Sequence, residues 1–184
     1  MKVLVLAFLL MAAGACSHTV TDDYQQYLNN NQGKTFPSVG YDVEYVLTPK
    51  TKGYTHSFKS AMGGLGNSWT INVGTVLDAT LKSQDVQSAF KSLKESSGKG
   101  SRVLTFDVEE YVFANHRAKI RLSVTETHNG KATLKKTYEQ EGISQGGKMF
   151  WGGAMAMKNA VQQSTKDALD KILTSMMTDL KAKR

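Results

Sequence analysis

The sequence predicts an α+β domain with a mostly antiparallel sheet, a three-stranded meander within it, and two main helices packed on one face. Three runs of alternating apolar and polar residues follow one another between residues 104 and 138, and Asn129-Gly130 between two of them is a strong hairpin signal. From Met157 to Leu180, apolar residues recur instead at helical spacing. Helices on one face of an antiparallel sheet define the α+β class.

The elements before the meander are less regular. A strand begins near Tyr41, where apolar and polar residues alternate until Pro49 stops the run. Residues 50–67 contain four glycines and are expected to form a long loop. A helix follows, which we extend back to Trp69. Its apolar face consists of Val73, Val76, Leu77 and Leu81. Residues 86–93 fit either a continuation of this helix or a short edge strand.

The meander supplies the predicted sheet core. One face of its first two strands is expected to be buried and consists of Leu104, Phe106, Val108, Ile120, Leu122 and Val124. The alternation slips by one residue at Glu109-Glu110, as a β-bulge would allow. A glycine-rich connector over residues 142–153 leads to the C-terminal helix. The apolar face of that helix consists of Met157, Val161, Ala168, Ile172, Met176 and Leu180.

The N-terminus has the pattern of a secretory signal peptide. Lys2 supplies the basic region, a short apolar run follows it, and small residues lead to Cys16, the only cysteine. The run is too short to cross a bilayer, which takes roughly 20 apolar residues. A cysteine directly after small residues resembles the lipobox of bacterial lipoproteins, although Ala13 occupies its usual leucine position. Lipidation of Cys16 would anchor the protein to a membrane. An ordinary secreted protein is the less favoured alternative, because its lone cysteine would have no disulfide partner.

These features divide the chain into three parts. Residues 1–15 are the lipoprotein signal peptide, residues 16–40 are the lipidated cysteine with a polar tether, and residues 41–184 form a single α+β domain. The tether is rich in Asn, Gln and Gly, and residues 24–28 are its one candidate for a short amphipathic turn.

The mature chain is basic. Without residues 1–15 it has 169 residues, of which 22 are basic and 16 acidic, a formal charge of +6. The charge is spread along the chain, which suits phosphate head groups, anionic glycans or acidic partners, or simply a solvated surface. Nucleic acid is a poor partner for an exported protein. A lipidated Cys16 leaves no disulfide, so stability depends on the core.

One segment matches two catalytic motifs in part. Gly142-Ile-Ser144-Gln-Gly146 matches the nucleophile elbow of α/β-hydrolases, but no histidine follows His128, whereas that family places its histidine after the serine. With Lys148 the segment also resembles a phosphate-binding loop, but Met149 stands where that loop has Ser or Thr. The histidines lack metal-ligand spacing. We therefore expect no enzyme activity, no metal and no cofactor.

Bulky apolar residues beside glycines are candidates for a protein interface. They are Trp69, Met149, Phe150 and Trp151. The alternative is that these residues pack in the core where loops cross the sheet.

The order of elements over residues 41–181 is similar to that of small Gram-negative envelope lipoproteins. The resemblance includes the lipobox, the tether, Asn-Gly-Lys at residues 129–131 and the strand end Tyr138-x-x-Glu-Gly142. The group includes the YajG-like lipoproteins and the auxiliary lipoproteins of ABC-type transport, and more distantly the lipoproteins of curli and exopolysaccharide export. The loop over residues 50–67 is long for the group, and the strand after the first helix is weak.

The resemblance implies a function as well as a fold. Members of the group resemble accessory or assembly subunits without catalytic residues, and several form rings. It also implies that aspartate after the lipidated cysteine favours the inner membrane, so Ser17 favours the outer membrane, facing the periplasm. We therefore expect a non-catalytic outer-membrane lipoprotein that assists an envelope transport or export machine, with protein partners and with homo-oligomers. Alternatives are a periplasmic carrier of lipid or glycan and, less favoured, a hydrolase using Ser144 in a rearranged triad.

Overall fold

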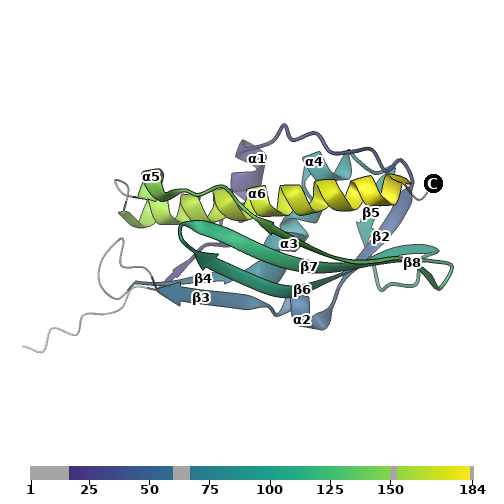
Figure 1. Ribbon diagram of the computed structural model, residues 1–184, viewed down its shortest axis with the longest axis horizontal. Helices are drawn as coiled ribbons and strands as arrows, with labels where there is room; N and C mark the ends of the chain where they lie inside the picture. The colour runs from purple at the N-terminus through teal and green to yellow at the C-terminus, as the bar shows by residue number, and fades with distance from the viewer. Residues whose placement is uncertain (1–16, 60–66, 150–152, 183–184) are drawn as a thin grey trace, which may run out of the picture.

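The structure is a computed structural model that describes residues 17–59, 67–149 and 153–182. A sheet of five strands is covered on one face by helices, and a second sheet of three strands lies toward one end of the molecule (Figure 1). Among the described residues, no helix combines the length and the hydropathy that a membrane span requires.

The larger sheet contains the predicted meander. In spatial order its strands are β5 (Ser92–Glu95), β2 (Asp42–Leu47), β6 (Arg102–Ala114), β7 (Arg117–His128) and β8 (Lys131–Glu141). Strand β2 runs parallel to β5 and β6, whereas β6, β7 and β8 pair antiparallel. The predicted α+β class with a mostly antiparallel sheet is therefore confirmed.

Two local features of the meander follow the sequence. Asn129 and Gly130 have positive φ angles of 49° and 76°, as the tight type I′ hairpin turn requires. The register between β6 and β7 shifts between Val108 and Glu110. The predicted bulge therefore lies where the alternation slips.

The core lies between the meander and two helices. All of the predicted core positions of β6 and β7 are buried, and so is the predicted apolar face of α6 (Gly153–Ala182). Helix α6 runs along the long axis over β7 and β8, and α3 (Val73–Leu81) packs beside it. The Asn72 side chain accepts a hydrogen bond of 3.0 Å from the N–H of Thr75 and so caps α3.

Two predictions between residues 50 and 72 are wrong. Residues 50–67 are not one long loop, because α2 (Pro49–Lys52) and β3 (Thr55–Lys59) occupy part of this range. The helix does not extend back to Trp69, which lies in β4 (Ser68–Asn72). Strand β4 pairs antiparallel with β3. This pairing with a separate segment outweighs the helical spacing of Trp69 and Val73.

The open choice over residues 86–93 resolves into a helix that is separate from α3 and the start of an edge strand. A separate short helix, α4 (Gln84–Gln87), is followed by β5. Strand β5 pairs in parallel with β2 at the edge of the sheet.

The prediction of a polar tether up to residue 40 is also wrong for the described part of that segment. Strand β1 (Ser17–Thr19) pairs in parallel with β4, and α1 (Tyr24–Asn30) confirms the predicted amphipathic turn. The buried apolar side chains of this segment are Val20, Tyr24, Leu28, Phe36 and Val39. The folded part of the chain therefore includes residues 17–40.

Replacement of Phe106 by alanine tests the core. The Phe106 ring is 0% exposed and packs edge-on against Tyr45, with ring centroids 6.4 Å apart. We expect Phe106→Ala to lower the free energy of unfolding by about 3–5 kcal/mol, because it leaves a cavity in the core. Chemical denaturation measures the loss. Thr105→Ala, on the opposite face of β6, is the control, and an equal effect of the two variants would contradict this packing.

Candidate functional site

The first residue that the structure describes follows the predicted lipidation site directly and lies in a strand. Cys16 itself lies outside the described residues, but Ser17 is the first residue of β1 and pairs with Ser68. Beyond the strand, the N–H of Val20 donates to the carbonyl oxygen of Thr70 at 2.9 Å, and the hydroxyl oxygen of Thr21 accepts from the N–H of Asn72 at 2.9 Å. The residue that follows the cysteine is therefore part of a sheet.

Polar contacts attach the N-terminal segment to α6. The side-chain amide of Gln162 donates to the Val20 carbonyl at 3.0 Å and to the Asp23 carboxylate at 2.6 Å, and Lys158 lies 2.7 Å from the same carboxylate. Partial burial alone would raise the pKa of Asp23. Hydrogen bonds from Lys158 and Gln162 outweigh burial, so this pKa lies below its usual value.

A second polar group lies close to α1. Burial raises the pKa of Asp170, although Lys166 contacts its carboxylate at 2.7 Å. Burial, with a smaller contribution from the charge of Asp170, raises the pKa of Tyr27 to about 12. These groups mark the contact between α1 and α6 as a polar, partly buried interface within the chain.

Strand β1, which follows Cys16 in the sequence, lies at one end of the molecule together with parts of several other elements. Strand β1, the start of β4, the end of β3, the short helix α5 (Gly146–Met149) and the start of α6 all lie at the same end of the long axis (Figure 1). In the described part of the chain, the exposed large hydrophobic side chains are Ile143, 57% exposed, and Met155, 71% exposed. They flank α5 in sequence. Met155 lies in the first turn of α6, at this end, whereas the N–H of Ile143 donates to the Asp167 carboxylate at 2.9 Å, near the middle of that helix.

The segment with the partial hydrolase motif lies beside a histidine. The N–H of Gln145 donates to the carbonyl oxygen of His116 at 2.9 Å, while Ser144 is exposed in the link between β8 and α5. Within the described residues, no hydrogen bond joins Ser144 to a histidine side chain, and no cluster of three or more His, Cys, Asp or Glu suits a metal ion. In the part of the chain that the structure describes, Ser144 is therefore not paired with a histidine base.

Gly142 of that motif has a packing role. A Cβ atom at this position would lie 1.9 Å from the carbonyl oxygen of Ser164 in α6. The hydroxyl oxygen of Ser164 accepts a hydrogen bond of 2.8 Å from the N–H of Ala118, and the N–H of Gly142 donates to the Ala118 carbonyl at 2.8 Å. Glycine here allows α6 to approach the sheet closely.

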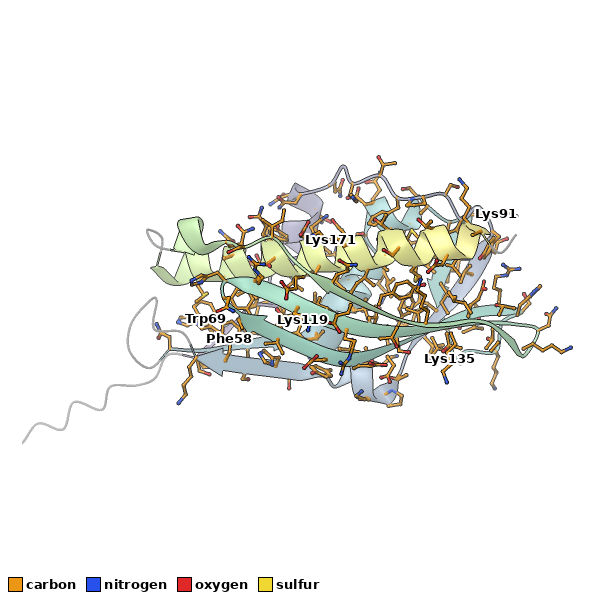
Figure 2. All side chains as sticks on the ribbon, viewed as in Figure 1. Phe58, Trp69, Lys91, Lys119, Lys135 and Lys171 are labelled. Carbon is orange, nitrogen blue, oxygen red and sulfur yellow. The ribbon has the colours of Figure 1, made fainter. Side chains whose placement is uncertain are left out.

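The predicted interface residues have different environments. Trp69 is 1% exposed, and its ring stacks on His18 with centroids 4.5 Å apart. In this single chain Trp69 is a core residue, as the alternative reading of the sequence expected. Figure 2 shows it near Phe58, its partner across the β3–β4 pair. Phe150, Trp151 and the side chain of Met149 lie outside the described residues, so their interface role stays a prediction.

The sequence did not lead us to predict one buried carboxylate, that of Glu126. Glu126 is 3% exposed, and its oxygens accept from Tyr41 at 3.1 Å and from Thr133 at 2.6 Å, with the Arg102 guanidinium 3.4 Å away. Arg102 also lies over the Tyr41 ring, 4.0 Å from its centroid. The alternation of β7 could have indicated Glu126, because it continues the buried series of Ile120, Leu122 and Val124.

The sheet face opposite the helices is polar and internally paired. Ion pairs cross it between Arg121 and Glu109 at 3.0 Å, and between Lys119 and Glu139 at 2.6 Å. Two separate hollows, of about 380 Å³ at the β6–β7 hairpin and about 370 Å³ beside β5 and the start of β6, are also lined in part by charged residues. Much of the charge on this face is therefore neutralised within the chain.

Comparison with known proteins identifies a similar fold and no family. No protein-family model and no curated protein matches the chain. The crystal structure of protein XCC0632 from Xanthomonas campestris, described by family-model DUF330, is similar with a TM-score of 0.51 and 12% sequence identity. The match covers 83% of this chain and 93% of that chain. At this identity the likeness concerns the fold alone.

Substitution of Gly142 tests the approach of α6 to the sheet. Gly142→Ala would force its Cβ into the Ser164 backbone, and we expect a loss of about 1–3 kcal/mol or more in the free energy of unfolding. Thermal and chemical unfolding measure it. Gly147→Ala is the matched control, since nothing lies within 4 Å of its added Cβ. Equal stability of the two variants would contradict the close contact.

The Asp23 contacts predict a pH dependence. Because the pKa of Asp23 is lowered in the folded state, its carboxylate contributes stability that is present above its usual value of 3.8 and is lost as pH falls through the lowered pKa. We expect Asp23→Asn to destabilise the protein at pH 7 and to differ less from the wild type at pH 3. Paired denaturation curves at both pH values measure this.

The neighbouring Asp22→Asn is the control, since Asp22 is exposed and lies outside the contact with Lys158 and Gln162. A difference between wild type and Asp23→Asn that is the same at pH 7 and pH 3 would exclude the carboxylate as its cause.

Proposed function

We propose that this protein is a non-catalytic lipoprotein of the outer membrane that acts as an accessory or assembly subunit of an envelope transport or export machine. The signal-peptide pattern and the lipobox-like sequence before Cys16 support export and lipidation. Ser17 after the cysteine supports the outer membrane, on the resemblance to envelope lipoproteins. The periplasm then surrounds the folded part.

The observation that carries this proposal is the position of Ser17 in β1. A lipid on Cys16 would hold the folded part directly at the membrane. There would be no flexible spacer of the kind that lets an anchored domain reach a distant target. A subunit held in this way is suited to act beside neighbouring membrane components. We therefore favour a fixed assembly role over a reaching or shuttling one.

The described surfaces support protein partners more than an enclosed cargo. A carrier would need an apolar space between sheet and helices. In the described residues, fully buried side chains such as Phe106, Leu122 and Ile172 come from both of these layers. The largest of the hollows that we describe, about 520 Å³, is on the outside, lined by residues that include Lys34, Asp85 and Ser88.

Membrane fractionation tests the anchor. We expect Cys16→Ser to release the protein from the membrane fraction, because the variant cannot be acylated and buried acyl chains contribute ~0.8 kcal/mol per CH₂. Ser17→Asp keeps the cysteine and should keep the protein membrane-bound, but should move it to the inner membrane. Sucrose-gradient separation of the two membranes measures both effects.

A second experiment tests for protein partners and uses the native lipidated protein. Crosslinking in intact cells, followed by identification of the linked species, should yield envelope proteins or copies of this chain. The yield should fall in Trp151→Ala without a change in melting temperature if residues 149–151 form the interface. A Cys16→Ser variant that stays membrane-bound would contradict the anchor, and a monomer without crosslinks would contradict the accessory role.

A further inference from the structure

Strand β8 is a long, open edge of the larger sheet. It has 11 residues and pairs with β7 on one side, and no other described strand pairs with it. On the face away from α6 its side chains are exposed, whereas those of β7 on the same face are mostly half-buried. Proteins usually shorten or cover such an edge, because its unpaired N–H and C=O groups can bind another strand.

The register with β7 identifies which backbone groups of β8 face the open edge. The N–H of Gly142, just beyond the strand, donates to the carbonyl oxygen of Ala118, which lies opposite it. In an antiparallel pair, residues that bond to the neighbouring strand alternate with residues whose N–H and C=O groups point away from it. The outward groups therefore belong to every second residue, and among the described residues they lack hydrogen-bond partners at Lys135, Thr137 and Glu139.

Two contacts limit the open edge to residues 135–139. Glu141 continues the outward series, but its carbonyl oxygen accepts a hydrogen bond of 2.9 Å from the Nζ atom of Lys171. At the hairpin end the register shifts beside Thr133, whose hydroxyl donates to the buried Glu126 carboxylate at 2.6 Å. A bulge of this kind interrupts further pairing.

The side chains along residues 135–139 complement one another in an antiparallel pair of two β8 strands. Lys135 lies on the side of the sheet away from α6 (Figure 2) and forms no ion pair with the described residues. With a two-fold axis at Thr137, Lys135 of each copy lies opposite Glu139 of the other. Three opposite pairs then exchange about six backbone hydrogen bonds, and two of these pairs join opposite charges.

Other two-fold registers fit less well. An axis at Lys135 or at Glu139 would place like charges opposite each other, which is destabilising. An axis one residue nearer the hairpin would leave Lys135 opposite Thr137, without an opposite charge. An axis one residue further along would place Lys135 opposite Glu141, but it would need the carbonyl group that Lys171 already occupies.

We propose that two copies of this chain pair through β8, with the two-fold axis at Thr137, so that their five-stranded sheets form one continuous sheet. An acidic strand of another protein would suit Lys135 but would bring a like charge to Glu139, so a second copy fits better. The pairing gives the proposed accessory subunit a partner. It uses residues of the folded part and does not depend on lipidation of Cys16.

Disulfide crosslinking of the full-length protein in membranes tests the register. Thr137→Cys places two thiols at the axis, where opposite Cα atoms are about 5.5 Å apart, a distance that a disulfide spans. We expect a crosslinked dimer under mild oxidation. Lys135→Cys is the matched control, because its two copies would be about 14 Å apart along the strands. It should crosslink only when it is co-expressed with Glu139→Cys. The unchanged protein controls for Cys16.

Charge reversal tests the cross-strand pairs. Lys135→Glu makes both of them repulsive, and we expect roughly tenfold weaker association in sedimentation experiments in detergent. Adding Glu139→Lys to this variant should restore association, because the charges are then exchanged and complementary again. Lys131→Glu makes the same charge change at an exposed position of β8 outside residues 135–139, and should leave association unchanged.

Each remaining outcome has a separate meaning. A monomer in sedimentation and in crosslinking overturns the dimer, and a crosslink from position 137 to another protein overturns the second copy as the occupant. Association that Lys135→Glu does not weaken overturns the register. These results leave the anchor intact, since it is measured by fractionation of Cys16→Ser. Protein that crosslinks at position 137 but is absent from membranes would instead contradict the anchor and support the dimer.

Discussion

Helix α6 is buried on more than one side, and this burial is the constraint on which the rest of the structure depends. One side packs on β7 and β8, while Gln162 and Lys158 contact the N-terminal segment. Polar residues in its buried surface are each paired: Ser164 with the Ala118 backbone and Thr165 with the Tyr111 hydroxyl at 2.8 Å. Such buried hydrogen bonds allow few alternative registers, because a shifted helix would leave them unpaired.

That arrangement joins segments that are far apart in the sequence. The N-terminal segment completes the smaller sheet through β1 and packs on α3 through α1, so residues 17–30 are also part of the core. Loss of its contacts would expose apolar side chains such as Tyr24 and Leu28. If Cys16 is lipidated, as we propose, its lipid would be attached directly before a structural strand and would hold the folded part at the membrane.

The functional proposal depends on this geometry more than on any chemical group. The Glu126 carboxylate is buried and that of Asp170 is partly buried, but each is paired with neighbours within the chain. The likeness to protein XCC0632 concerns the fold and adds no function. Within the described residues, β1 and the first turn of α6 lie at one end of the long axis, and the β7–β8 hairpin lies at the other.

Local patterns in the sequence determined the meander, its bulge, the Asn129-Gly130 turn and the long C-terminal helix. These elements bury one face against a single neighbouring layer, so the period of their apolar residues is sufficient to identify them. The alternation of β7 also indicated the burial of Glu126. A carboxylate is nevertheless expected to be exposed until its partners Arg102, Tyr41 and Thr133 come together from distant parts of the sequence.

Only the tertiary structure determined the conformation of residues 17–40 and of the described parts of residues 50–72. Strands β1, β3 and β4 have at most five residues each, and β1 pairs with a strand about 50 residues away. Segments this short have no stable conformation alone, and their hydrogen bonds exist only once the partner strand is present. The sequence therefore could not distinguish a polar tether from a strand, or place Trp69 in β4, because that information lies in the pairing.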